Sequence, residues 1–134
     1  MTLASIVHEE TNAADEMARV AGVYVNRLRM GMPLQADPTL KYAAGDFSIK
    51  RVLDKHKTID SPYNTYMYAG LPPTPIAMPD MAAIEGVLGY EEHDYLYFCA
   101  RPEMDGRHNF ARTLREHNNN AAAYHRALDK LNIR

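Results

Sequence analysis

Apolar residues recur along this chain mostly at the spacing of one helical face. Near the N-terminus, Leu3, Ile6 and Val7 follow the i, i+3, i+4 pattern of an amphipathic helix. Most of the chain is therefore expected to be helical. The predicted helices cover residues 2–10, 13–30, 38–44, 48–56, 79–89 and 113–131.

Capping signals mark the ends of these helices. Asn12 can end the first helix in a left-handed conformation and cap the second, with Asp15 completing a near capping box. Thr113 and Glu116 form a capping box for the last helix. The other boundaries rest on Gly31, on the Asp37-Pro38 cap and first-turn proline, and on Gly45.

Two short segments carry strand signals. Residues 95–100 form an apolar run typical of a fully buried strand, and the Asp105-Gly106 turn returns the chain through residues 107–110 as its hairpin partner. The chain has 134 residues, of which 46% are hydrophobic, enough for one core. We expect an α+β fold: a mainly helical single domain over residues 1–134 with a small antiparallel β-hairpin.

The acidic residue Glu10 continues the apolar face of the first helix. Because that helix should end directly after it, burial and the negative end of the helix dipole both raise the pKa of this carboxyl. A carboxylic acid protonated near neutral pH is typical of a general acid. Two plainer interpretations remain open: a half-exposed side chain at a frayed end, and neutralisation by Arg27 or Arg29.

Composition excludes several classes of partner. Fifteen Lys and Arg residues against 17 Asp and Glu give a net charge of −2 with no basic run, which argues against nucleic acid. The lone Cys99 fits a buried small hydrophobe. We see no apolar stretch of membrane-spanning length and no signal peptide. Since the chain starts within a helical pattern, we expect a domain excised from a longer protein.

The sequence offers no metal, cofactor or serine-nucleophile motif. The segment from His8 to Asn12 begins like a zinc-protease helix, but Asn12 stands where a second histidine is needed. The other histidines lack ligand spacing, and no serine lies in a glycine-flanked elbow. We therefore expect neither a metal nor a cofactor.

The segment from Asp60 to Pro79 carries five prolines and is rich in tyrosine and amide side chains. A long irregular segment in a compact domain is usually functional or disordered, and the aromatic content argues against disorder. Amides and aromatic faces suit carbohydrate, which offers hydroxyls and an apolar ring face. The candidate sugar-binding residues are Gln35, Tyr63, Asn64, Thr65, Tyr66 and Asp37, although Asp37 serves equally well as a helix cap.

Several longer motifs, in order, resemble the YceG-like (MltG) family of endolytic murein transglycosylases over nearly the whole chain. They are Ile6-Val7-x-x-Glu10-Thr11, Val20-Ala21-Gly22-Val23, Asn26-Arg27-Leu28-Arg29-x-Gly31-Met32-x-Leu34-Gln35-x-Asp37-Pro38-Thr39, Pro62-Tyr63-Asn64-Thr65-Tyr66, Gly70-Leu71-Pro72-Pro73-x-Pro75-Ile76, Asp94-Tyr95-Leu96-Tyr97-Phe98, His108-x-Phe110 and His117-Asn118.

The resemblance implies a catalytic domain that cuts peptidoglycan strands between MurNAc and GlcNAc and leaves 1,6-anhydro-MurNAc ends, thereby terminating nascent strands. It assigns the catalytic glutamate to Glu10. The chain departs from the family at His8 and Glu9, where a glutamate and a lysine are usual, and at Met78, where an asparagine is usual before Pro79. The first departure changes the local charge, and the second removes a possible helix cap.

The resemblance also implies a full-length protein that is membrane-anchored at the extracytoplasmic face of the cytoplasmic membrane, in the cell envelope, with cell-wall synthesis proteins as partners. A single acid suffices for a lytic transglycosylase, because the MurNAc C6 hydroxyl is an internal nucleophile. Two alternatives remain: a hydrolytic muramidase using Glu10 and Asp37, and a non-catalytic peptidoglycan-binding module in which Glu10 is exposed and dispensable.

Overall fold

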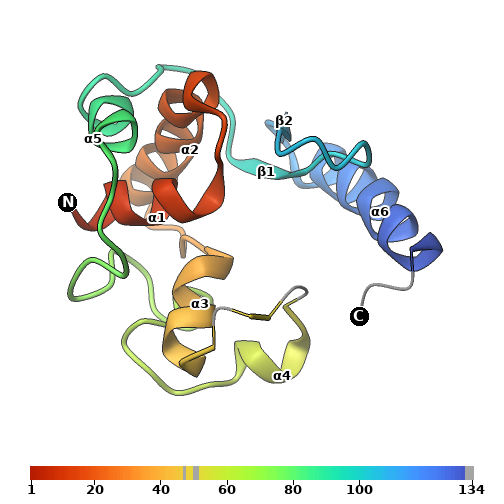
Figure 1. Cartoon of the computed structure of the whole chain (residues 1–134), viewed down its shortest axis with the longest axis horizontal. Helices are drawn as coiled ribbons and strands as arrows, with labels where there is room; N and C mark the ends of the chain where they lie inside the picture. The colour runs from red at the N-terminus through yellow and green to blue at the C-terminus, as the bar shows by residue number, and fades with distance from the viewer. Residues whose placement is uncertain (47, 50–51, 132–134) are drawn as a thin grey trace.

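A computed structural model describes residues 1–46, 48–49 and 52–131. The described part is mainly helical with one two-stranded antiparallel sheet, which confirms the expected α+β class (Figure 1). Its elements are α1 (Thr2–Glu10), the short 3-10 helix η1 (Ala14–Glu16), α2 (Met17–Met30), α3 (Asp37–Ala44), α4 (Asp54–Lys57), α5 (Met81–Leu88), β1 (Tyr97–Ala100), β2 (His108–Ala111) and α6 (Leu114–Lys130).

Helices α1, α2, α3 and α5 form the larger unit, called here the helical body. Ile6, Val7 and Val20 are fully buried between α1 and α2, as the periodicity predicts. The chain after α5 crosses α2 closely at Gly22, where an added Cβ would lie 2.3 Å from the carbonyl oxygen of Glu91. Only glycine fits there, so this crossing fixes where the chain leaves the helical body.

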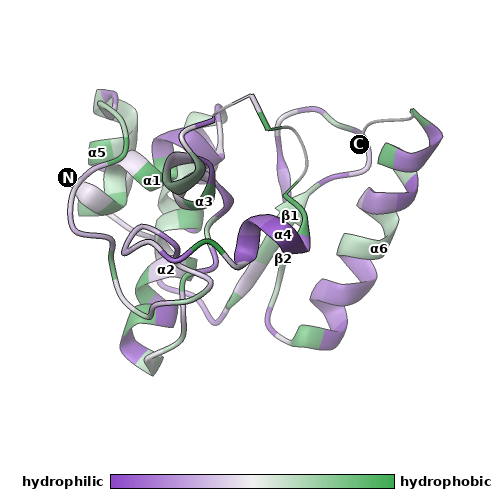
Figure 2. Cartoon of the chain, turned by 90° about the horizontal axis from the view of Figure 1, so that it is seen from below, coloured by the Kyte–Doolittle hydropathy of each residue, from purple (hydrophilic) through white to green (hydrophobic). Residues whose placement is uncertain are grey.

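Strands β1 and β2 together with α6 form a second unit, called here the hairpin unit, which lies to the right of the helical body in Figure 1. Tyr97 pairs with Ala111 and Ala100 with His108. Helix α6 packs on both strands, and its residues alternate between polar and apolar in Figure 2. The hairpin is confirmed, but the expectation of a fully buried strand is wrong: all of β1 is half-buried, because α6 covers only part of it.

Several capping predictions are confirmed. Gly31 and Gly45 end α2 and α3 in left-handed conformations, with φ of 70° at both. Thr113 and Glu116 form the capping box of α6. At α5 the cap is Asp80, whose carboxylate accepts from the backbone N–H of Ala83 at 2.9 Å, so the helix does not need an asparagine at position 78.

Other local predictions are wrong. Asn12 neither adopts positive φ nor caps a helix; the Thr11 hydroxyl accepts from the Ala13 N–H instead, at 3.1 Å. Asp15 pairs with Arg107 rather than completing a capping box. Asp37 lies inside α3 rather than capping it, with Ala36 at the N-cap.

The helix expected over 48–56 is also wrong in its described part. Residues 48–49 and 52–53 are not helical, α4 spans Asp54–Lys57 only, and positions 50 and 51 lie outside the described residues. One physical reason is a local turn: the Asp46 carboxylate accepts from the Ser48 N–H at 2.9 Å, a bond that competes with helix formation.

Candidate active site

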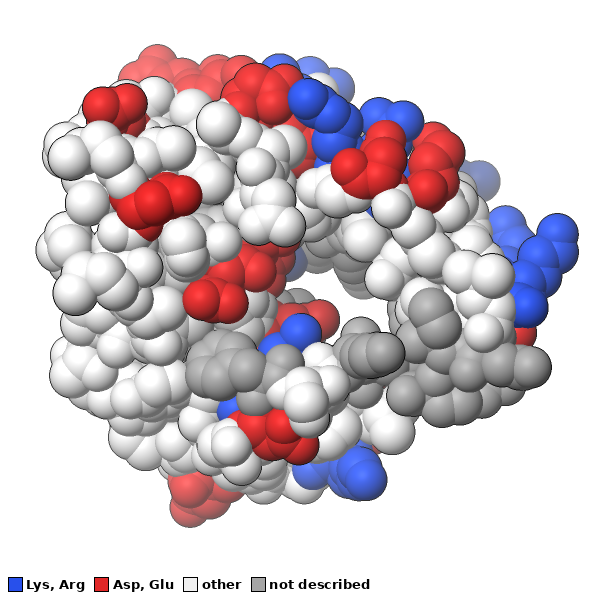
Figure 3. Space-filling view, in the orientation of Figure 1, with Lys and Arg blue, Asp and Glu red and all other residues white. Residues whose placement is uncertain are grey.

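Two adjoining cavities of about 460 and 380 Å³ lie between the helical body and the hairpin unit. The larger reaches α3 and Tyr66, and the smaller reaches the hairpin turn around Gly106. In Figure 3 the molecule is hollowed between its two units, with acidic atoms exposed on the wall of the hollow. Together the cavities form one groove, since they share the lining residues Glu9, Glu10, Ala100, His108, Tyr124 and Leu128.

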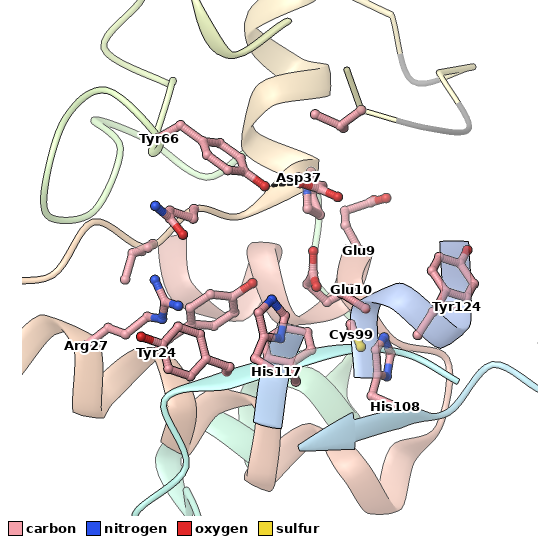
Figure 4. Close-up of a pocket in the computed structure, with 18 of the residues that line it drawn as sticks. Glu9, Glu10, Tyr24, Arg27, Asp37, Tyr66, Cys99, His108, His117 and Tyr124 are labelled. Carbon is pink, nitrogen blue, oxygen red and sulfur yellow. Dashed lines mark hydrogen bonds between the residues drawn. The ribbon is translucent and has the colours of Figure 1, made fainter. Parts of the chain in front are cut away.

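Glu10 lies in the middle of the groove as the last residue of α1 (Figure 4). Desolvation by the surrounding protein is the main cause that raises the pKa of its carboxyl from 4.5 to about 8, and the negative charge of Asp37 adds to it. Lys41 and a hydrogen bond from Tyr24 act in the opposite direction but do not cancel the increase. Glu10 is therefore a protonated acid at neutral pH that is only half-buried and borders open space.

The end of α1 is not frayed, and neither Arg27 nor Arg29 neutralises Glu10. Thr11 N–H donates to the Val7 carbonyl oxygen at 3.3 Å, so the last turn of α1 is closed rather than frayed. Arg27 donates to the carbonyl oxygens of Leu96 and Pro33, both at 2.7 Å, and Arg29 donates to the Tyr90 hydroxyl. Neither arginine contributes to the charge balance at Glu10.

Asp37 and Tyr66 form a hydrogen-bonded pair on the α3 side of the groove. The Tyr66 hydroxyl donates to Asp37 Oδ1 at 2.5 Å, and Lys57 Nζ lies 5.1 Å from the centroid of the Tyr66 ring. Burial and the Asp37 charge raise the pKa of the Tyr66 hydroxyl, which keeps it protonated as a donor. Both side chains line the groove, as does the exposed Gln35, whose backbone has a φ of 52°.

Three other candidates from the irregular segment lie outside the groove lining. Asn64 is fully buried; its amide donates to the carbonyl oxygens of Lys57 and Ile59 and its side-chain oxygen accepts from the Tyr66 N–H. Thr65 is buried and accepts from the Ala36 N–H at 2.9 Å. The ring of Tyr63 packs against Tyr42, and its hydroxyl is hydrogen-bonded to the Thr74 hydroxyl. These residues hold the loop that carries Tyr66.

The hairpin unit supplies groove residues that the sequence-based list lacks. His108 of β2 and His117 of α6 both line the groove. His117 stacks on Tyr97, and its Nδ1 is buried without a hydrogen-bond partner in the described part of the chain. Burial and the charge of Arg27 lower the pKa of His117, which favours the neutral imidazole. One signal was available: His117 lies three residues after Leu114 and four before Ala121, at the spacing of one helical face.

Cys99 belongs to the groove lining, whereas His8 does not. Cys99 lines the groove half-buried, and burial raises the pKa of its thiol. His8 lies beside Asp80 at the start of α5, with 3.6 Å between Nδ1 and Oδ1, and does not line the groove. His8 therefore lies outside the groove, whereas the neighbouring Glu9 lines both cavities. In the described ranges, no three His, Cys, Asp or Glu side chains cluster as a metal site would require.

The fold and the groove define a mixed α+β domain with the protonated Glu10 in the middle of its groove. The sequence profile of the YceG-like family matches residues 1–123, and the chain belongs to this family. It is 47% identical over 118 residues to the endolytic murein transglycosylase of Bacillus subtilis, covering 88% of this chain and 32% of that protein. The corresponding protein of Streptococcus pneumoniae serotype 2 is 34% identical over 128 residues, with 92% and 23% covered.

A solved structure agrees with this family. The crystal structure of the yceG-like protein lmo1499 from Listeria monocytogenes superposes with a TM-score of 0.80 at 42% identity, covering 88% of this chain and 38% of that one. The chain thus spans about a third of the length of its Bacillus relative. None of the helices in the described residues is long and apolar enough to cross a bilayer.

Proposed function

We propose that this domain is the catalytic part of a lytic transglycosylase that cleaves peptidoglycan strands internally. The observation that carries the proposal is Glu10, a carboxylic acid with a pKa of about 8 in the middle of a groove that continues on both sides of it. The Bacillus and Streptococcus relatives are named endolytic murein transglycosylases, which supports the same reaction class.

In the proposed reaction, protonated Glu10 donates to the glycosidic oxygen between MurNAc and GlcNAc as the C1–O bond breaks. The C6 hydroxyl oxygen of the same MurNAc attacks C1 and forms the 1,6-anhydro ring. With Glu10 as the sole catalytic group, the carboxylate that remains takes up the C6 hydroxyl proton. No water enters the glycan, so one acid suffices for bond cleavage. A raised pKa fits this role, because Glu10 holds its proton at neutral pH while remaining open to the groove.

The sugars would be held mainly from the α3 side. Gln35, Asp37 and Tyr66 line the groove and offer an amide, a carboxylate and an aromatic face. In this proposal Asn64, Thr65 and Tyr63 act indirectly, by holding the loop that carries Tyr66, because their side chains are already hydrogen-bonded within the protein. The direct sugar contact expected of these three is therefore not retained.

Internal cleavage fits the shape of the groove. A strand of many sugars can bind across Glu10 only if space continues on both sides, and the two cavities provide it.

We further propose that the full-length protein is membrane-anchored at the extracytoplasmic face of the cytoplasmic membrane, where it terminates nascent strands beside cell-wall synthesis proteins. The relatives' names and their greater length support these proposals.

A muramidase mechanism is the second candidate, because Asp37 lies close enough to Glu10 for its charge to raise that pKa. A non-catalytic binding module fits less well, since it has no use for a half-buried protonated acid. Purified glycan strands digested in heavy-oxygen water separate these functions. Unlabelled anhydro-MurNAc ends are expected; label at the new MurNAc end would mean hydrolysis, and intact strands would mean a binding module.

A further inference from the structure

His108 and Glu16 form a buried histidine–carboxylate pair beside the groove. Glu16 lies at the start of α2, and its two oxygens accept from the His108 backbone N–H at 3.0 Å and from Nδ1 at 3.1 Å. The side chains are only 10% and 6% exposed. The pair joins residues 92 positions apart and fixes both the backbone and the ring of His108.

This arrangement determines which ring nitrogen faces the groove chemistry. An ionised carboxylate only accepts hydrogen bonds, so Nδ1 carries the hydrogen and the lone pair of the neutral ring is on Nε2. In the described part of the chain, the side-chain hydrogen bond of His108 is the one from Nδ1 to Glu16. His108 lines both cavities, as Glu10 does, and Figure 4 shows its ring projecting from β2 toward the pocket that Glu10 faces.

We propose that His108 is a second catalytic residue, whose Nε2 takes the proton of the MurNAc C6 hydroxyl while Glu10 protonates the leaving oxygen. This inference rests on the proposed function. In one step the C6 oxygen bonds to C1, the C1–O bond to GlcNAc breaks, the hydroxyl proton moves to Nε2 and the Glu10 proton moves to the GlcNAc oxygen. The imidazolium then returns its proton through solvent to Glu10, which restores both groups.

Glu16 is the positioning residue in this scheme. Its carboxylate stabilises the imidazolium that forms and holds the ring orientation, as carboxylates do for histidine bases in other enzymes. The neighbouring cation Arg107 is engaged with Asp15, at 2.9 and 3.0 Å. The other titratable groups that line the groove around His108 are Glu9 and Glu10 of α1, Tyr24 and Arg27 of α2, Asp37 and Lys41 of α3, Lys57 of α4, Tyr66 of the irregular segment, Tyr97 and Cys99 of β1, and His117, Tyr124 and His125 of α6.

The pH profile distinguishes one proton-transfer group from two. If Glu10 acts alone, kcat/KM needs only its protonated form and stays level below a pH of about 8. If His108 takes the C6 proton, kcat/KM also falls on the acidic side as the imidazole gains a proton. The wild-type protein should therefore show a bell-shaped profile, with Glu10 responsible for the alkaline limb.

The sharpest variant is His108→Asn, because asparagine keeps a donor near the Nδ1 position for Glu16 and has nothing at Nε2. We expect kcat on purified glycan strands to fall by about 10²–10⁴-fold, the range for loss of a general base. The acidic limb should disappear, the alkaline limb should stay, and the melting temperature should remain close to that of the wild type. His117→Asn is the matched control, which removes another groove histidine and should keep the acidic limb.

Either of two results would overturn the inference: a folded His108→Asn variant with wild-type turnover, or a wild-type profile with no acidic limb. The second measurement decides the matter even if the variant does not fold. Failure of the proposed function would look different, because the wild type itself would then yield labelled ends or no cleavage. Anhydro ends from the wild type together with an unaffected His108→Asn variant would reject His108 alone.

Discussion

The two walls of the groove are built by different means. On the wall of the helical body, Glu10 ends a helix whose inner face packs Ile6 and Val7 at zero exposure against α2. On the hairpin wall, β1 and most of β2 are only half-buried. Phe98 and Phe110 pack against the edge of the core, and hydrogen bonds from Arg27 to Leu96 and from His108 to Glu16 join the unit to the body. Apolar packing tolerates small changes, whereas each directional bond can be removed singly.

This difference means that the walls should fail in different ways. The acid is fixed by the core, so a variant of Glu10 should lose chemistry and keep the fold. The hairpin wall is fixed by a smaller apolar contact, made by Phe98 and Phe110, and by a few buried polar groups, so removing one of these polar groups should loosen the wall before the core unfolds. The following predictions test this contrast.

The largest expected effect is that of Glu10→Gln. The amide keeps the shape of the side chain and cannot donate the carboxyl proton, so kcat on glycan strands should fall by about 10²–10⁴-fold. The fold should persist, as judged by circular dichroism. Wild-type turnover in this variant would remove Glu10 from the catalytic role.

The same variant has a stability signature against pH. The folded-state pKa of Glu10 is raised, from 4.5 to about 8, so its proton favours the folded state. The difference in free energy of unfolding between wild type and Glu10→Gln should be constant below about pH 4.5. As the pH rises the wild type should lose stability relative to the variant, and the difference should level off above about pH 8. Denaturant titrations below, within and above this range would measure it, and a difference independent of pH would contradict the raised pKa.

Arg27→Met tests the hairpin wall. Methionine fills similar space but loses the hydrogen bonds to Leu96 and Pro33 and the contact with the Tyr97 ring at 5.0 Å. Charged hydrogen bonds contribute roughly 1.5–3 kcal/mol each, so we expect a loss of about 3 kcal/mol. Hydrogen exchange should increase in β1, β2 and α6 more than in α1 and α2.

The matched control for Arg27→Met is Arg29→Met, one of the exposed positions on the same helix. Arg29 is exposed, and it donates to the Tyr90 hydroxyl at 2.6 Å and lies over the ring of the same tyrosine, so this change should cost under about 1 kcal/mol. Equal losses in the two variants would contradict the view that the buried arginine anchors the hairpin unit.

Asn64→Ala tests whether the irregular loop is held by its own hydrogen bonds. The change leaves the carbonyl oxygens of Lys57 and Ile59 and the N–H of Tyr66 without their partner, which should lower the free energy of unfolding by about 1–3 kcal/mol. Thermal melting would measure this, with the exposed Asn12→Ala as control. A stable variant with reduced turnover would instead return Asn64 to the list of sugar contacts.

The sequence allowed prediction wherever the signal is local and repeated. The helical period placed Glu10 beside the core, and Gly31 and Thr113 marked helix ends because their capping chemistry involves only neighbouring residues. The pairing of Glu16 with His108 crosses 92 positions and leaves no local pattern. We expected Asn64 to contact sugar because the sequence does not distinguish an exposed asparagine from a buried one. In the structure its side chain is buried and hydrogen-bonded within its own loop.

The smallest expected effect, and the one that best separates two reaction classes, is that of Asp37→Asn. The charge of Asp37 raises the pKa of Glu10, so removing it should lower that pKa and move the alkaline limb of the kcat/KM profile to lower pH. The amide oxygen of the substituted side chain can still accept from the Tyr66 hydroxyl, so the α3 side of the groove should keep its shape.

Turnover of Asp37→Asn well below the limb should fall by no more than about tenfold, since the transglycosylase reaction needs no second carboxylate. Tyr66→Phe serves as control: it breaks the same hydrogen bond but leaves the Asp37 charge, so the limb should move less. A muramidase that uses Asp37 as nucleophile or base would lose its activity altogether in Asp37→Asn. Such a loss, with the fold intact, would reassign the groove from an internal C6 nucleophile to a pair of carboxylates acting across the glycosidic bond.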